Sequence, residues 1–357
     1  MSEQRQDFRV RKDDLRTGAW TTVPEAPLAD GEARLRVDRF VITANNITYA
    51  AVGSGALAYW RFFPADEGWG RVPVWGFATV ADSRTPGLEA GVRIYGYLPM
   101  STTLTVRPRL TSAGFVDASE HRAGLPPLYN QYSRVTPELE LTEVQMVLRP
   151  LFGTSFLIDD ALGDNGFHGA ERVIVASASS RTAIGLAHML ARREGEVRIV
   201  GLTSVRNRAF VEGLGYYDEV VTYDQAGDLP VAPSVLVDMS GDAPVLHAVH
   251  SRLGGALKHS MIVGATHWEK GASTSPPLSG PAPEFFFAPA QMMKRAADWG
   301  PGGFQQRYAP AWEDFTKQAE RWLRIVHHQG RVGVEAAYGA VVSGEAKPDE
   351  GHIVSLA

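Results

Sequence analysis

The sequence predicts an α/β protein in which a doubly wound parallel sheet follows an antiparallel β-barrel. The first third of the chain holds short β runs separated by turn residues, at the spacing typical of an antiparallel barrel or sandwich. The middle alternates apolar β runs with helical segments, which is typical of a parallel sheet with helices on both faces.

The composition bounds the class of protein. The chain has 357 residues, enough for two domains, and its 44% hydrophobic content is ordinary for a globular protein. The net charge is −5, and acidic and basic residues are interspersed along the chain, so no nucleic-acid-binding surface is indicated. The absence of cysteine excludes disulfides and thiolate chemistry. Residues 1–16 do not resemble a signal peptide, and no apolar run is long enough to span a membrane, so a cytoplasmic enzyme is expected.

The N-terminal part is expected to be all-β. Residues 1–32 are interpreted as an extended arm or edge strand, and the alternating residues 32–44 as a half-buried strand. Further short β runs follow at 72–80, 91–99 and 101–119.

The boundary with the α/β part is expected near Pro150. Residues 141–166 contain two helical stretches, which Pro150 and Gly153 are expected to separate. A βαβ unit follows at 172–224, and residues 234–242 form another buried strand, ending at Asp238.

The C-terminal part returns to helix and strand. Residues 247–267 supply a helix, a Gly-Gly turn and a strand, and the Pro-, Ser- and Gly-rich stretch 271–284 is expected to be a mobile connection. Residues 312–330 are predicted to be one amphipathic helix, and 334–356 a helix and a β run. The face of the 312–330 helix would consist of Phe315, Ala319, Trp322, Leu323 and Val326.

The turn after the first strand of the βαβ unit is the main candidate site. The first turn of such a unit lets a phosphate approach the backbone, and the start of the helix favours negative charge. The usual glycine pattern is absent, and small or hydroxylated residues replace it, so that hydroxyls and one arginine would contact a pyrophosphate. The alternative is a serine-rich helix cap without a ligand. The candidate cofactor-binding residues here are Ser177, Ser179, Ser180, Arg181, Thr182 and Ala183.

The end of the next strand indicates which nucleotide would bind. Residues 201–208 hold no carboxylate for a ribose 2′-hydroxyl, but they include Ser204, Arg206 and Arg208. A guanidinium suits a phosphate, which favours NADPH over NADH; the alternative is a solvated, charged helix start. Tyr223 could stack near the adenine or simply end a surface strand.

Several segments together resemble the medium-chain dehydrogenase/reductase superfamily, in particular its zinc-free quinone oxidoreductase and enoyl reductase branches. The similarity extends from about Glu32 to the end of the chain. The segments that match the family's motifs are 44–53, 74–99, 141–162, 166–191, 206–224 and 344–356. Two departures stand out: the glycine turn is degenerate, and Arg93-Ile94 replaces a pair that would carry an aspartate.

The resemblance implies a GroES-like catalytic domain built from both chain ends and a Rossmann domain inserted between them. The implied boundaries are 1–148 and 305–357 for the catalytic domain and 149–304 for the nucleotide-binding domain. The substrate would react where the nicotinamide meets the barrel, and a homodimer is expected.

Asn46 and Tyr49 lie on the segment that matches the family's active-site edge. Asn46 would hydrogen-bond the substrate or the nicotinamide ribose, and Tyr49 would protonate an enolate-like centre or hold a carbonyl oxygen. The alternative is that both stabilise a loop, Asn46 through an Asx turn. The first domain is also rich in aromatic residues, which would suit a flat, hydrophobic substrate or would simply pack the barrel; these residues are Tyr59, Trp60, Trp69, Tyr95 and Tyr97.

The leading hypothesis is an NADPH-dependent, zinc-free reductase of a quinone or an α,β-unsaturated carbonyl compound. His247, His250 and His259, or His267 with Glu269, do not show a recognisable zinc spacing, so no metal site is expected. No membrane or nucleic-acid partner is expected. The competing hypothesis is an inactive relative that senses NADP(H) or serves as a scaffold.

Overall fold

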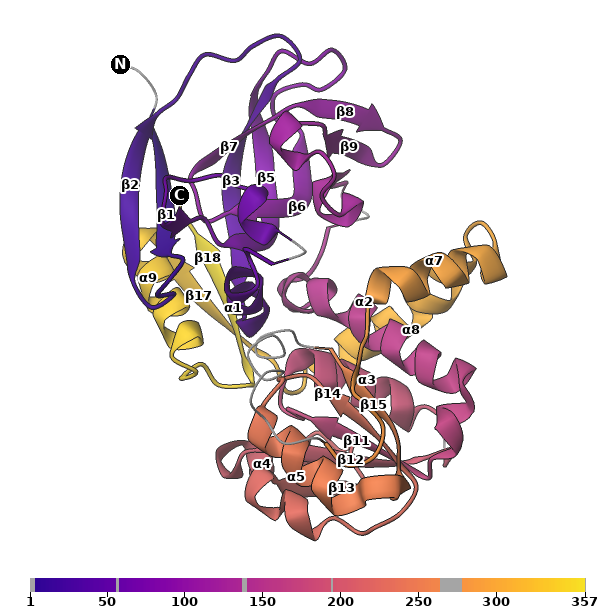
Figure 1. The fold of residues 1–357 in the computed structure, drawn as a ribbon. Coiled ribbons are helices and arrows are strands. Elements are labelled where there is room, and N and C mark those ends of the chain that lie inside the picture. The colour runs from indigo at the N-terminus through magenta and orange to yellow at the C-terminus, as the bar shows by residue number, and fades with distance from the viewer. Residues whose placement is uncertain (1–3, 56–57, 137–139, 194, 264–277, 357) are drawn as a thin grey trace. The chain divides into compact units, whose positions relative to one another are not determined.

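A computed structural model describes residues 4–55, 58–136, 140–193, 195–263 and 278–356. The chain divides into two compact units: unit 1 comprises Met1–Val147 and Leu323–Ala357, and unit 2 comprises Leu148–Trp322 (Figure 1). The predicted return to the first domain at residue 305 lies inside a helix of unit 2, and the chain re-enters unit 1 only at Leu323.

Unit 1 contains two mainly antiparallel sheets. The smaller has the order β2-β1-β4, so the predicted N-terminal arm is a hairpin of β1 (Gln4–Arg11) and β2 (Gly18–Pro24), and β4 is Trp69–Gly70. The larger has the order β17-β18-β3-β5-β6-β10-β9-β8, and β7 also pairs with β3. Its strands are β3 (Ala33–Ile42), β5 (Pro73–Ser83), β6 (Arg93–Pro99), β7 (Thr103–Val106), β8 (Pro108–Thr111), β9 (Gly114–Asp117), β10 (Gln131–Arg134), β17 (Arg324–Gln329) and β18 (Glu350–Ser355).

The N-terminal and C-terminal segments of unit 1 meet in this larger sheet through β3 and β18. β18 runs antiparallel to β3, with Ser355 opposite Arg39, and parallel to β17. The helices α1 (Ala44–Ala51) and α9 (Gly330–Val342) also belong to unit 1, together with the 3-10 turns η1 (Tyr59–Arg61), η2 (Glu120–Arg122) and η3 (Pro127–Asn130).

Unit 2 is built on a parallel sheet of order β13-β12-β11-β14-β15-β16. The central strands of this sheet are short and mostly buried, as expected where helices cover both faces, whereas the edge strand β16 is exposed. The strands are β11 (Arg172–Ala176), β12 (Arg198–Thr203), β13 (Glu219–Thr222), β14 (Ser234–Asp238), β15 (Leu257–Ile262) and β16 (Glu284–Phe285). The predicted βαβ unit and the predicted strand ending at Asp238 are both present.

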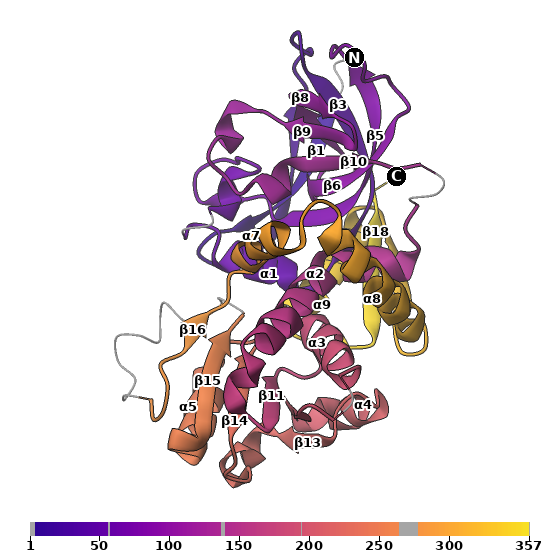
Figure 2. The same cartoon turned by 90° about the vertical axis from the view of Figure 1, so that its right-hand side faces the viewer.

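Helices cover both faces of this sheet (Figure 2). Alternate residues of β11 point to opposite sides: Val173 and Val175 pack with α2 (Glu143–Asp164) and α3 (Arg181–Ala191), whereas Ile174 packs with α5 (Ala243–Leu253). The remaining elements of the unit are α4 (Arg208–Gly213), α7 (Ala288–Trp299) and α8 (Gly303–Ala319), with the 3-10 turns η5 (Gly166–Gly169), η6 (Val205–Asn207), η7 (Tyr223–Asp228) and η8 (Gly254–Ala256).

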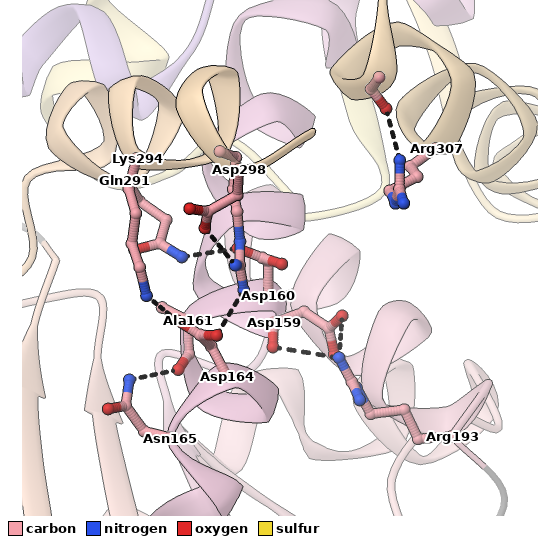
Figure 3. Close-up of polar contacts among 12 residues, drawn as sticks. Asp159, Asp160, Ala161, Asp164, Asn165, Arg193, Gln291, Lys294, Asp298 and Arg307 are labelled. Carbon is pink, nitrogen blue, oxygen red and sulfur yellow. Dashed lines mark hydrogen bonds and ion pairs between the residues drawn. The ribbon is translucent and has the colours of Figure 1, made fainter. Parts of the chain in front are cut away.

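An ion-pair network fastens α7 to α2 (Figure 3). Arg295 Nε donates to Asp160 Oδ2 at 2.7 Å and its Nη2 lies 2.9 Å from Asp164 Oδ1, while Gln291 Nε2 donates to Asp160 at 2.6 Å. At the neighbouring residue of α2, the buried Asp159 accepts a hydrogen bond from Arg193 Nε at 2.8 Å, which joins α2 to the segment just after α3. Since α7 has no fully buried residue of its own, these polar contacts contribute much of what holds it in place, beside the stacking of Trp299 on Phe304.

Two predicted elements are wrong. Residues 143–164 form one helix, because the buried Leu148, Leu151 and Phe152 stabilise it through Pro150. The predicted helix 312–330 ends at Ala319, and residues 324–329 form β17 because β18 supplies them with a strand partner. The first half of the expected connection 271–284, residues 271–277, lies outside the described residues.

Candidate functional site

The parallel sheet of unit 2 has a topological switch point between β11 and β14. From β11 the chain proceeds outward through β12 and β13, and it then crosses to β14 on the other side of β11. Ala176 and Asp238, the last residues of β11 and β14, lie opposite each other. In open α/β sheets, ligands bind at the carboxyl ends of the strands beside such a point.

Ser177 turns the chain at this edge in a left-handed conformation, with φ of 58°. That conformation costs an L-residue about 1–2 kcal/mol, which is why glycine usually occupies such a turn. The backbone path of a glycine turn is therefore retained although the sequence has a serine.

The N-terminus of α3 follows the turn directly. Ser180 caps the helix and accepts from Ala183 N at 3.3 Å, whereas helix geometry leaves the N–H groups of Arg181 and Thr182 without intrahelical acceptors. Ser155 Oγ donates to Thr182 O at 2.8 Å and fixes this turn against α2. Since the peptide dipoles of α3 add positive potential at this end, the geometry suits a phosphate.

The loop after β12 is joined to the same turn. Ser204 precedes η6, and Asn207 Nδ2 donates to Ser179 Oγ at 3.0 Å. Arg206 and Arg208 are both exposed, and Arg208 Nε donates to Glu212 at 2.8 Å along α4. The structure thus brings the two predicted halves of the nucleotide site together, but it also gives Arg208 a carboxylate partner.

Two tyrosines contact the turn through their hydroxyl groups. Tyr223 Oη lies 3.3 Å from Ser177 Oγ, and burial is the main cause that raises the pKa of Tyr223. Tyr217 Oη donates to Ala178 O at 2.9 Å. A Cβ added to Gly201 would lie 2.9 Å from the Tyr217 ring, so only glycine lets β12 approach it without a shift. Tyr217, Gly201 and Asn207 were not among the predicted site residues, because their contacts join segments distant in sequence.

Two buried polar atoms at this edge lack a hydrogen-bond partner among the described residues. They are Thr203 Oγ1, at the end of β12, and Asp238 Oδ2. The other Asp238 oxygen accepts from the backbone N–H groups of Ser240 and Gly241, at 2.9 and 3.1 Å, and burial raises the pKa of this carboxyl. Buried polar atoms without a hydrogen-bond partner are rare in proteins. These two atoms, the turn at Ser177 and the N-terminus of α3 together make this edge of the sheet suitable for binding a dinucleotide.

In unit 1, Asn46 is buried and its amide is bonded to the backbone. Its Oδ1 accepts from Thr43 N at 2.6 Å, and its Nδ2 donates to Pro73 O at 2.8 Å. This arrangement favours the loop-stabilising alternative for Asn46, which holds the start of α1 against β5.

Tyr49 lies in a cluster of aromatic side chains. Trp75 Nε1 donates to its hydroxyl at 3.3 Å, and the rings of Tyr59 and Tyr97 lie 4.6 and 5.5 Å away between centroids. Tyr129 Oη is 3.0 Å from Tyr59 Oη. Burial raises the pKa of Tyr49 well above its ordinary value, and Tyr129 adds to the rise. Tyr49 is therefore a neutral hydrogen-bond donor at pH 7 and a poor source of a free proton.

The other aromatic candidates mostly pack the domain. Tyr59, Trp60 and Tyr97 belong to the buried core of unit 1, and Tyr95 is also buried. Trp69 instead lies beneath the guanidinium of Arg9, 4.8 Å from the ring centre. Trp75 and Tyr129, which sequence reasoning did not select, are only partly buried and form the more accessible part of the cluster.

The described residues contain no group of three or more potential metal ligands. His250 is bonded instead to Ser279 O and Ser260 Oγ, at 2.8 and 2.9 Å. His267 and Glu269 lie outside the described residues. Among the described helices, none is long and apolar enough to cross a membrane.

Comparison with solved structures shows which class of fold this is. CurA from Vibrio vulnificus in complex with NADPH is 13% identical and matches with a TM-score of 0.61 over 99% of both chains. CurK enoyl reductase (14%, 0.54) and a putative NADPH:quinone reductase from Bacillus thuringiensis (12%, 0.56) also match over 99% of both chains. The expected fold, a Rossmann-type parallel-sheet domain together with a GroES-like antiparallel domain, is confirmed.

The sequence assigns the chain to a family that is more specific than the fold class. Residues 40–347 match the family described as protein of unknown function (DUF2855), and the chain belongs to this family. No curated protein matches the sequence.

Proposed function

We propose that this protein is an NADPH-dependent, zinc-free reductase that acts on a quinone or an α,β-unsaturated carbonyl compound. The main supporting observation is the left-handed turn at Ser177, which leads into the α3 N-terminus at the switch point of the sheet. CurA was solved in complex with NADPH on a similar fold, which supports the cofactor assignment.

Different residues would bind different parts of the cofactor. The α3 N-terminus with Ser179, Ser180 and Thr182 would hold the pyrophosphate, because these are the N–H and hydroxyl donors at the turn. Arg206 and Arg208 would bind the 2′-phosphate, since residues 201–208 hold no carboxylate to repel it. Tyr223 would lie beside the adenosine.

Bound NADPH would supply a hydride to the electrophilic carbon of the acceptor. Tyr49 would then donate a hydrogen bond to the acceptor's carbonyl oxygen, and water would supply the proton. Its raised pKa favours this role over proton release, because a tyrosinate would be costly among the surrounding rings. Trp75 and Tyr129 would offer flat apolar surfaces to the acceptor.

A second candidate function is NADP(H) binding without catalysis. It is favoured by the structural hydrogen bonds that occupy Asn46 and by the burial of Tyr49. A homodimer in the cytoplasm is proposed for either function.

Titration of the purified protein with NADPH and NADH, followed by energy transfer from tryptophan, tests the cofactor. The reductase predicts saturable NADPH binding and NADPH oxidation by quinones or enones. Binding without turnover over a broad acceptor panel would support the sensor, and the absence of binding would refute both.

A further inference from the structure

A separate, open cavity of about 270 Å³ lies at the surface of unit 1 beside η1. Its volume lies just below the range of roughly 300–1,000 Å³ that is usual for sites of drug-sized ligands, which suits a small metabolite. The lining residues are Lys12, Trp60, Arg61, Pro64, Ala65 and His121.

The charge of the lining is positive. Lys12 and Arg61 are both exposed and basic, and none of the lining residues is acidic. The contact of Arg61 Nη2 with Ala123 O is long, at 3.4 Å, so most donors of this guanidinium are available to a ligand. Asp66, the acid nearest in sequence to Ala65, forms an ion pair with Arg9.

His121 shapes the site without adding charge at neutral pH. Its Nε2 lies 3.3 Å from Phe62 O, and because a carbonyl only accepts, this nitrogen carries the proton. Burial, followed by the neighbouring Arg122, lowers the pKa of His121. The attraction for an anion therefore comes from Lys12 and Arg61.

Trp60 gives the cavity a rigid apolar wall. A Cβ added to Gly53 would lie 2.3 Å from the indole, and one added to Gly70 would lie 2.4 Å from it. The backbone therefore packs closely against the ring at both glycines and restricts its movement. Pro64 and Ala65 add apolar surface.

We propose that this cavity binds a small organic carboxylate with an aromatic or acyl body. The carboxylate would lie between Lys12 and Arg61, and the body would pack against Trp60. The inference does not depend on the reductase function, because the site lies within unit 1 and can be tested without a cofactor.

The test uses benzoate as the probe and benzamide as its uncharged analogue. The full-length protein is titrated by calorimetry and by NMR of the Trp60 indole N–H, which a Trp60→Phe variant identifies. We expect saturable 1:1 binding of benzoate with a shift of this signal, and much weaker binding of benzamide.

The variant K12Q/R61Q should weaken benzoate binding by about fivefold for each cation removed, the upper range for exposed ion pairs. The matched control R109Q/K347Q removes two exposed cations elsewhere in unit 1 and should bind like the wild type. Equal binding by K12Q/R61Q and the wild type, with both folded by circular dichroism, would overturn the proposal. So would the absence of saturation, or a response of Trp60 to inorganic phosphate as strong as its response to benzoate.

Discussion

Replacing Arg206 and Arg208 together by alanine should convert a preference for NADPH into indifference between NADPH and NADH. Both arginines are exposed at the end of β12, where a 2′-phosphate would lie if α3 holds the pyrophosphate. A hydrogen bond to a charged group contributes roughly 1.5–3 kcal/mol.

The structure reduces this expectation for Arg208. Arg208 already pairs with Glu212, and the two side chains are 45% and 49% exposed. Giving up an exposed pair of this kind costs only about 0.3–0.5 kcal/mol. With solvent screening, the double variant should lose about 3 kcal/mol of NADPH affinity, or roughly 100-fold in Kd.

The assay is the same fluorescence titration, performed with both cofactors, and with 2′,5′-ADP as a competitor that displaces NADPH, because 2′,5′-ADP has no nicotinamide to accept energy from tryptophan. The matched control is K258A/K317A, which removes two exposed lysines of unit 2. We expect NADPH and 2′,5′-ADP to weaken together, with NADH nearly unchanged and the control like the wild type. Equal losses for NADPH and NADH would refute the assignment of the arginines while leaving nucleotide binding itself intact.

Three further predictions concern catalysis, the core of unit 1 and pH. Tyr49→Phe keeps the ring packing but removes the hydroxyl, so kcat should fall by about 100-fold with NADPH affinity unchanged, as seen in steady-state kinetics; an unaltered kcat would exclude Tyr49. Asp117→Asn leaves the buried guanidinium of Arg122 opposite a neutral amide instead of a carboxylate at 3.0 Å, and should lower the free energy of unfolding in urea by about 3 kcal/mol; a loss below about 1 kcal/mol would contradict this. His188 is buried and its pKa is lowered to about 4, mainly by burial, so the unfolded state binds its proton first and stability should fall between pH 6.5 and pH 4. His188→Gln should flatten this dependence in urea titrations across that range, and an identical slope would disprove the contribution of His188.

The sequence was sufficient where local pattern and final structure agree. The βαβ unit could be predicted because apolar runs, a capping serine at Ser180 and helical periodicity all occur within one short segment. The turn at Ser177 could be placed, but its left-handed backbone could not, since nothing in a serine demands that conformation.

Distant contacts account for the failures. Proline inside a helix costs about 3 kcal/mol, so a break at Pro150 was a reasonable expectation, but burial of the surrounding apolar residues outweighs that cost. Residues 324–329 suit either helix or strand, and only pairing with β18, far along the chain, decides between them. The hydrogen bonds that occupy Asn46 depend on Pro73 O in the same way.

The pairing of β18 with β3 in one sheet has a consequence for biosynthesis. β3 is made early, yet its Arg39–Ile42 edge acquires a partner only when β18 leaves the ribosome. Until then the apolar Phe40, Val41 and Ile42 lie beside unpaired backbone groups, whereas every described strand of the parallel sheet has already been synthesised. In nascent chains stalled before residue 350, unit 2 should therefore be folded, whereas unit 1 should be incompletely folded and dependent on chaperones.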